Sequence, residues 1–215
     1  MLTLYSYFRS SAAYRVRIAL NLKGQTYQTV PVHLLREGGV QRSAGYRARN
    51  PQGLVPFLET ESGGFGQSLA ILEYLEGSVP APALLPAEPA ARARVRAFAQ
   101  HIACDIHPLN NLRVLQYLTG TLGISEDAKL AWIQHWIAEG FRALEAEVEQ
   151  HNPSGPYCFG EQLTFAEVCL VPQWFNAERF QCDLTPYPRL AAVVKACNEL
   201  PAFQAAQPSR QPDFE

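Results

Sequence analysis
The segment of residues 79–87, VPAPALLPA, most strongly constrains what this chain can fold into. It carries three prolines, and proline both removes a main-chain hydrogen-bond donor and disrupts helix interiors. Its composition is not that of a flexible Gly/Ser tether, and Leu84 and Leu85 form an apolar pair within it. We therefore predict a linker over residues 81–88, which separates a domain of residues 1–80 from a domain of residues 89–215.

Residues 1–80 alternate short β-prone runs with segments whose apolar positions step at helical spacing. This alternation predicts a small α/β layer in the order βαβ followed by ββα, the arrangement of a thioredoxin-like domain. The predicted elements are strand 2–6, helix 11–23, strand 26–32, a short helix or irregular stretch at 40–48, strand 55–60, strand 65–66 and helix 68–77.

Everything beyond the linker follows helical spacing. A first helix is predicted over 89–118, where Pro108 should kink it, and others near 125–150, 164–178 and 187–199. Thr164 followed by Glu167 before an apolar run indicates a capping box at the start of the third. The predicted fold class is therefore α/β plus all-α, with an N-terminal thioredoxin-like domain and a C-terminal helical bundle domain.

The composition and net charge of the chain exclude several classes of protein. The 215 residues carry 18 basic and 20 acidic side chains, for a net charge of −2, without the basic excess of a nucleic-acid binder. No apolar run approaches the ~18–20 residues that cross a bilayer, and the first residues lack a signal-peptide pattern. Five cysteines without a C-x-x-C pair fit a reducing compartment better than a disulfide framework or zinc site. We expect a cytoplasmic, metal-free protein that binds neither nucleic acid nor membrane.

Ser10 and Ser11 stand where the first predicted strand hands over to the first helix. Small hydroxyl residues at such a junction are suited to bind an anion or a thiolate, because unpaired N–H groups of the helix N-terminus lie beside them. An ordinary helix cap uses the same residue types. The local sequence leaves these two readings open.

Eight stretches of the sequence carry a resemblance that runs from end to end. They are SYFRSSAAYRVRIALNLKG, NPQGLVPFLE, QSLAILEYLE, PALLP, DIHPLNNLRVL, LTFAEVCLVPQ, AERFQCDLTPYP and FQAAQPSRQPD. In this collinear order they resemble the zeta class of glutathione transferases. The resemblance implies glutathione as cofactor, a helical domain that supplies the substrate pocket, and a homodimer.

The resemblance also implies roles for residues of the first domain. Ser10 and Ser11 would contact the glutathione thiolate as the catalytic pair, with Ser10 the activator in preference to Tyr7. Val55 would pair through its backbone with the cysteinyl part of glutathione, and Pro56 would be cis. Gln67 and Ser68 would hold the γ-glutamyl carboxylate, and Gln52 would hold the glycyl end.

Further residues are assigned to the pocket by the same resemblance. His107 and Asn111, four residues apart and so on one helical face, would line the cofactor and substrate pocket. Arg9 and Arg179 would bind the carboxylates of an acidic substrate, because a guanidinium can hold a carboxylate bidentately. Zeta enzymes often carry a cysteine directly after the two serines, and this chain has Ala12 there. Any sulfur chemistry must then use the sulfur of glutathione.

The implied reaction is a glutathione-dependent cis–trans isomerisation of a maleyl-substituted diketo acid, a step of aromatic or tyrosine degradation. Maleylacetoacetate is the favoured substrate and maleylpyruvate the alternative. A general glutathione transferase or α-halo-acid dehalogenase is a second possibility, and a non-catalytic association module a third. The combination of Ser10, Ser11, Val55 and Gln67 argues against the last of these.

Overall fold

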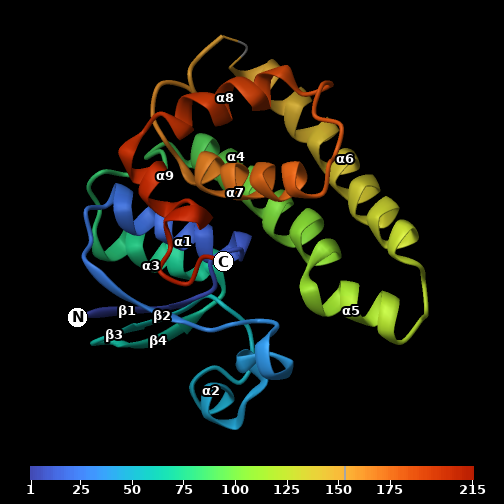
Figure 1. Ribbon diagram of the computed structural model, residues 1–215. Helices are drawn as coiled ribbons and strands as arrows, with labels where there is room; N and C mark the ends of the chain where they lie inside the picture. The colour runs from blue at the N-terminus through green and yellow to red at the C-terminus, as the bar shows by residue number, and fades with distance from the viewer. Residues whose placement is uncertain (153) are drawn as a thin grey trace. The chain divides into compact units, whose positions relative to one another are not determined.

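The computed structural model describes residues 1–152 and 154–215, and its backbone contacts divide them into two compact units. The first comprises Met1–Ala83 and Asn198–Glu215, and the second comprises Leu84–Cys197 (Figure 1). The predicted limits of independent domains at 81–88 stay a prediction. The contacts nevertheless group residues 198–215, predicted as part of the helical domain, with the first unit.

The first unit is built on a four-stranded sheet with the order β2-β1-β3-β4. The central strand β1 runs parallel to β2 and antiparallel to β3, and β3 forms a hairpin with β4. This topology confirms the predicted thioredoxin-like layer. The strands are β1 (Leu2–Ser6), β2 (Tyr27–Pro31), β3 (Phe57–Thr60) and β4 (Gly63–Gly66).

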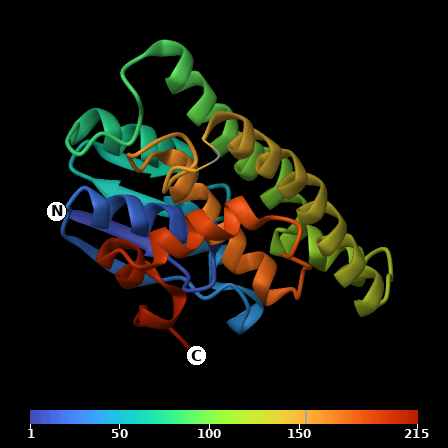
Figure 2. The same ribbon diagram turned by 90° about the horizontal axis from the view of Figure 1, so that it is seen from above.

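Two helices, α1 (Ser11–Leu22) and α3 (Ser68–Ser78), lie on one face of this sheet (Figure 1). A third, α9 (Pro201–Ala206), lies alongside α1 in both views (Figures 1 and 2). Because α1 has the sheet and α3 on some sides and α9 on another, it is buried almost all round, Arg15 and Arg17 included. The shorter elements are η1 (Arg36–Gly38), η2 (Val40–Arg42), α2 (Ala44–Arg49) and η5 (Pro208–Arg210).

Arg17 of α1 connects this helix to the loop before it and to the end of α9. Its side chain is fully buried, and its guanidinium donates to the carbonyl oxygens of Ala206 at 2.9 Å and Phe8 at 3.0 Å. Burial lowers the pKa of Arg17 to about 10, an effect opposed by nearby groups that include the Asp213 carboxylate. Residues 198–215 are therefore fixed to α1 by buried polar contacts as well as by apolar packing.

Apart from an isolated bridge between Tyr157 and Gly160, the regular elements of the second unit are helical in the part of it that the structure describes, which confirms the predicted all-α half. The break near Pro108 is larger than the predicted kink. A π-helical turn, η3 (His101–Ile106), and a 3₁₀ turn, η4 (His107–Asn110), follow the first helix, and a separate helix begins after Asn111. The helices are α4 (Pro89–Gln100), α5 (Leu112–Gly120), α6 (Glu126–His151), α7 (Phe165–Arg179) and α8 (Pro188–Asn198), with α6 beside α5 in Figure 2.

Two local features explain the break and the start of α7. Pro108 has no N–H to donate, and Asn111 adopts extended backbone while its side chain accepts the N–H of Arg113, so a new helix starts there. The predicted capping box is confirmed: Thr164 caps α7, and Glu167 accepts the N–H of Thr164 at 2.6 Å. No helix among residues 1–152 and 154–215 is long and apolar enough to span a membrane.

Candidate functional site
The register of the sheet brings four loops to one edge. Tyr5 of β1 pairs with Val30 of β2 and with Phe57 of β3, and Phe57 pairs with Gly66 of β4. The chain therefore leaves β1, β2 and β4, and enters β3, at the same edge. The predicted site residues of the first unit lie in these loops.

Both helices that begin at this edge present unneutralised N-termini. Neither α1 nor α3 carries an acidic residue in its first turn. The N–H groups of a first helical turn lack intrahelical partners, and the helix dipole adds positive potential there. This edge is therefore electrostatically suited to negative groups of a ligand.

Ser10 is the N-cap of α1, so the capping reading is confirmed. Its Oγ accepts the N–H of Ala13 at 3.2 Å, and Ser11 occupies the first helical position. A hydroxyl has one donor proton in addition to its acceptor lone pairs. The cap uses only an acceptor site of Ser10, which leaves the O–H available to a ligand. The two readings that the local sequence left open are thus compatible.

The loop before β3 presents a main chain that is available for pairing. The predicted cis bond at Val55-Pro56 is confirmed. Among the described residues, neither the N–H nor the C=O of Val55 has a hydrogen-bond partner. The neighbouring carbonyl of Leu54 is held by the hydroxyl of Tyr46 at 2.7 Å and by the side-chain amide of Asn50 at 2.8 Å. Anchoring by α2 and its C-cap therefore fixes a loop whose next residue stays free to bind.

The structure brings Gln52 and Gln67 together. The Gln67 side-chain amide donates to Oε1 of Gln52 at 2.8 Å. Gln67 precedes α3 with φ 66, a left-handed conformation that costs a non-glycine residue about 1–3 kcal/mol. Strain of this kind is concentrated at binding sites. Ser68, the first residue of α3, is buried, and its Oγ accepts an N–H of Arg15 at 3.1 Å.

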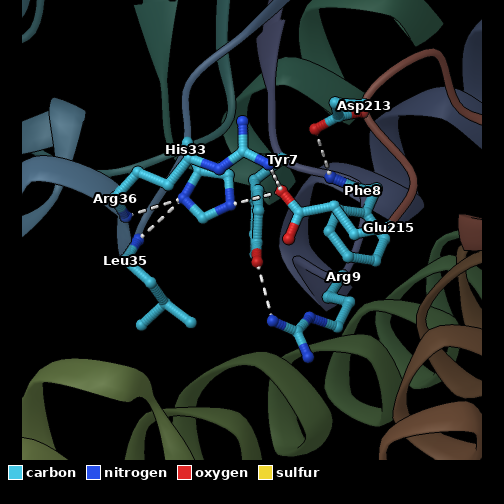
Figure 3. Close-up of polar contacts among 8 residues, drawn as sticks. All are labelled: Tyr7, Phe8, Arg9, His33, Leu35, Arg36, Asp213 and Glu215. Atoms are coloured by element: carbon cyan, nitrogen blue, oxygen red, sulfur yellow. Dashed lines mark hydrogen bonds and ion pairs between the residues drawn. The ribbon is translucent and has the colours of Figure 1, made fainter.

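Arg9 stands beside the serines, oriented by two aromatic neighbours (Figure 3). Its Nη2 donates to the hydroxyl of Tyr7 at 2.9 Å, and its Cζ lies 5.0 Å from the ring centroid of Phe8. The Arg9 Nε is buried and has no hydrogen-bond partner within the described part of the chain. A charged group with an unused buried donor is suited to receive a carboxylate.

The remaining predicted residues, His107, Asn111 and Arg179, belong to the second unit. His107 and Asn111 were expected on one face of a continuous helix, and this is wrong because the helix is broken between them. They still meet, with His107 Nε2 3.5 Å from Asn111 Nδ2. Arg179 ends α7, where its Cζ lies 4.4 Å from the ring centroid of Phe180. Their roles toward a ligand stay predictions.

Some residues at the site edge were missed by sequence reasoning. His33 follows β2, and residues 213–215 pack against the loop of residues 7–9 (Figure 3). The stretch FQAAQPSRQPD contains nothing that indicates which loop it contacts. Tyr46 and Asn50 carry no local signal for their shared acceptor at Leu54.

Comparisons with known proteins identify the family. The family model described as "Glutathione S-transferase, N-terminal domain" matches residues 4–83, and that of the C-terminal domain matches residues 131–196. A probable maleylacetoacetate isomerase of Vibrio cholerae is 50% identical over 99% of this chain and 98% of its own length.

Two solved structures are similar over nearly the whole chain. A bacterial zeta-class maleylpyruvate isomerase matches with a TM-score of 0.96 and 49% identity, covering 99% of this chain and 100% of its own. A maleylacetoacetate isomerase from Methylobacterium extorquens AM1, with bound malonate and GSH, matches with a TM-score of 0.94 and 38% identity, covering 99% of both chains. The chain belongs to the zeta class of the glutathione S-transferase family.

Proposed function
We propose that this protein is a glutathione-dependent cis–trans isomerase that converts maleylacetoacetate to fumarylacetoacetate. The observation that carries the proposal is the donor arrangement at the start of α1, where the Ser10 hydroxyl keeps a free proton beside an unneutralised helix N-terminus. The Methylobacterium relative holds GSH and malonate, a dicarboxylate, which supports the same pairing of ligands here.

The residues at the sheet edge fit glutathione by the chemistry of their donors. The unpaired main chain of Val55 suits the peptide of the cysteinyl residue. The N-terminus of α3 with Gln67 and Ser68 suits the γ-glutamyl carboxylate, and Gln52 suits the glycyl end. Where water is excluded, a polar group of the tripeptide needs a hydrogen-bond partner from the protein, and each of these groups can supply one.

When bound, glutathione supplies the sulfur nucleophile that adds reversibly to the cis double bond and allows rotation. A free thiol has a pKa of about 8.5, and making it mostly ionised at neutral pH needs a shift worth roughly 2.7 kcal/mol. The Ser10 hydroxyl and the N–H groups of α1 favour the charged form of that sulfur. Because the residue directly after the two serines is Ala12, the chain itself contributes no sulfur at this place.

The arginines bind and neutralise the negative charge of the substrate. Arg9 binds one carboxylate through its unpaired Nε and holds the diketo acid beside the thiolate. Its positive charge also stabilises the negative charge that develops on the substrate as the double bond is lost. Arg179, and the pair His107 and Asn111, are proposed to complete the pocket.

Maleylpyruvate is a second candidate substrate, favoured by the TM-score of 0.96 to a maleylpyruvate isomerase. The two diketo acids share the maleyl head that reacts and differ in the tail. The V. cholerae relative, 50% identical over 98% of its own length, supports maleylacetoacetate.

We also propose that the protein is a cytoplasmic homodimer acting in tyrosine degradation. Sedimentation equilibrium should then give twice the mass of one chain.

The function is tested with purified protein, each maleyl diketo acid in turn, and glutathione at a small fraction of the substrate concentration. Proton NMR should show complete conversion of the cis to the trans olefin while the glutathione signals persist, with the higher kcat/KM for maleylacetoacetate. No conversion of either acid would overturn the proposal. Release of halide from an α-halo acid without any isomerisation would instead indicate a transferase.

A further inference from the structure
Residues 213–215 pack against the loop that carries Arg9 (Figure 3). The main-chain N–H of Phe8 donates to Oδ2 of Asp213 at 3.0 Å, and the rings of Phe8 and Phe214 meet edge to face at 5.6 Å. Phe8 is only 2% exposed. Residues more than 200 positions apart in sequence thus share one small core beside Ser10.

Glu215 reaches the same loop by another route, through His33. Its Oε1 lies 2.9 Å from His33 Nε2 and 2.6 Å from Nη2 of Arg36. The other ring nitrogen of His33, Nδ1, accepts the N–H groups of Leu35 at 3.1 Å and Arg36 at 2.8 Å. Because two donors point at Nδ1, the ring proton resides on Nε2 and is donated to Glu215.

The fixed imidazole in turn supports Tyr7. The rings of His33 and Tyr7 pack edge to face at 5.0 Å, and Tyr7 is 4% exposed. The Tyr7 hydroxyl accepts the hydrogen bond from Arg9 Nη2 at 2.9 Å. A continuous series of contacts therefore runs from Glu215 through His33 and Tyr7 to the guanidinium of Arg9.

We propose that residues 213–215 and His33 form a positioning element that fixes the rotamer of Arg9 for the carboxylate of the substrate. This inference rests on the proposed function, in which Arg9 binds that carboxylate. An arginine side chain has many rotamers, and a small displacement of a substrate-binding group lowers the fraction of productive complexes. Glu215 touches no substrate and acts only through His33.

Exposure separates this role from a contribution to stability. The side chains of Glu215 and Arg36 are 43% and 68% exposed, so their ion pair adds little to the stability of the fold. A matched pair exists in the second unit, where Glu139 and Arg142 are 45% and 67% exposed. Asp213 is a poorer probe because its charge also stabilises the buried Arg17.

The test compares Glu215→Ala, Glu215→Gln and the control Glu139→Ala. We expect Glu215→Ala to raise KM for the maleyl diketo acid roughly fivefold, with the melting temperature and the Kd for glutathione unchanged. Glu215→Gln should restore KM to within about twofold of the wild type, because an amide oxygen still accepts from His33 Nε2. Glu139→Ala should match the wild type in every measurement.

A second readout does not depend on activity. In the Glu215→Ala protein, the NMR signal of the Arg9 Nε–H should exchange with water faster than in the wild type, and it should be restored in Glu215→Gln. Unchanged exchange in Glu215→Ala would overturn the inference whether or not the protein is an isomerase. The inference would also be overturned if the wild type is active and Glu215→Ala has the same KM. The same holds if KM rises in Glu215→Ala and is equally high in Glu215→Gln. If exchange is faster in Glu215→Ala but the wild type has no isomerase activity, only the proposed function is overturned.

Discussion
A serine hydroxyl can accept one hydrogen bond and donate another, and this property is central at the scale of single residues. Ser10 accepts from Ala13 to begin α1, and Ser68 accepts from Arg15 at the start of α3. These contacts use only an acceptor site of each hydroxyl and leave its proton available. A residue that begins a helix and a residue that binds an anion can therefore be the same one.

The first prediction separates the two roles of Ser10. Ser10→Ala should cost about 1 kcal/mol of stability through the lost cap and lower kcat/KM roughly a hundredfold through the lost donor. Ser125 is the matched control, because its Oγ caps α6 by accepting the N–H of Ala128 at 3.1 Å. Denaturant unfolding should show similar losses for Ser10→Ala and Ser125→Ala, while only the former loses activity. Equal activity in both variants would assign thiol activation elsewhere.

Tyr46 gives a prediction for the dependence of stability on pH. Burial raises the pKa of Tyr46 to about 12, because it disfavours the phenolate, whereas an unfolded tyrosine has a pKa of about 10. Between these values the folded state retains a proton that the unfolded state has released. The contribution of this hydroxyl is therefore complete below pH 10 and is lost as the pH rises toward 12.

The variant Tyr46→Phe isolates that contribution from those of the other tyrosines. It removes the hydrogen bond to Leu54, so wild type should exceed it by roughly 1 kcal/mol in the free energy of unfolding near neutral pH. Denaturant titrations from neutral pH upward should show this difference shrinking above pH ~10. A difference that stays constant across the alkaline range would contradict the raised pKa.

At the scale of elements, local signals predicted most boundaries and missed the contacts made at a distance. The capping residues Thr164 and Glu167 lie three positions apart and could be seen directly. Pro108 predicted a disturbance but not its extent, since the new helix also needed Asn111 as a cap. Sequence patterns report the neighbours along one element, whereas tertiary contacts decide how a disturbed segment continues.

The capping box of α7 supplies the prediction at this scale. Glu167 is fully buried and accepts the N–H of Thr164 at 2.6 Å and that of Cys158 at 2.8 Å. Glu167→Ala leaves both donors unsatisfied in the interior, which should lower the free energy of unfolding by roughly 2–5 kcal/mol.

The N-cap of α4 provides the comparison for Glu167. Glu88 accepts the N–H groups of Ala90 and Ala91, but it is exposed, so water can replace it. Chemical denaturation of Glu88→Ala should therefore show a much smaller loss of stability than that of Glu167→Ala. Equal losses in the two variants would show that burial does not determine the cost of the Glu167 substitution.

At the scale of the whole molecule, the order of strands and helices and the family could be predicted from the sequence. The assignment of residues 198–215 to the first unit could not, because their partners lie on α1 and in the loop before it. Arg17 illustrates the reason, because its acceptors at Phe8 and Ala206 are set by tertiary packing. The candidate residues around Ser10 came from motifs, and the support beneath Arg9 came only from the structure.

The central claim is that the sheet edge ionises the sulfur of bound glutathione. The ultraviolet absorbance of the thiolate, measured as a function of pH with saturating protein, tests it directly on the complete wild-type protein. We predict a bound thiol pKa well below the free value of about 8.5, and a return toward that value in Ser10→Ala. A bound thiol that titrates in wild type with its free pKa would contradict the account.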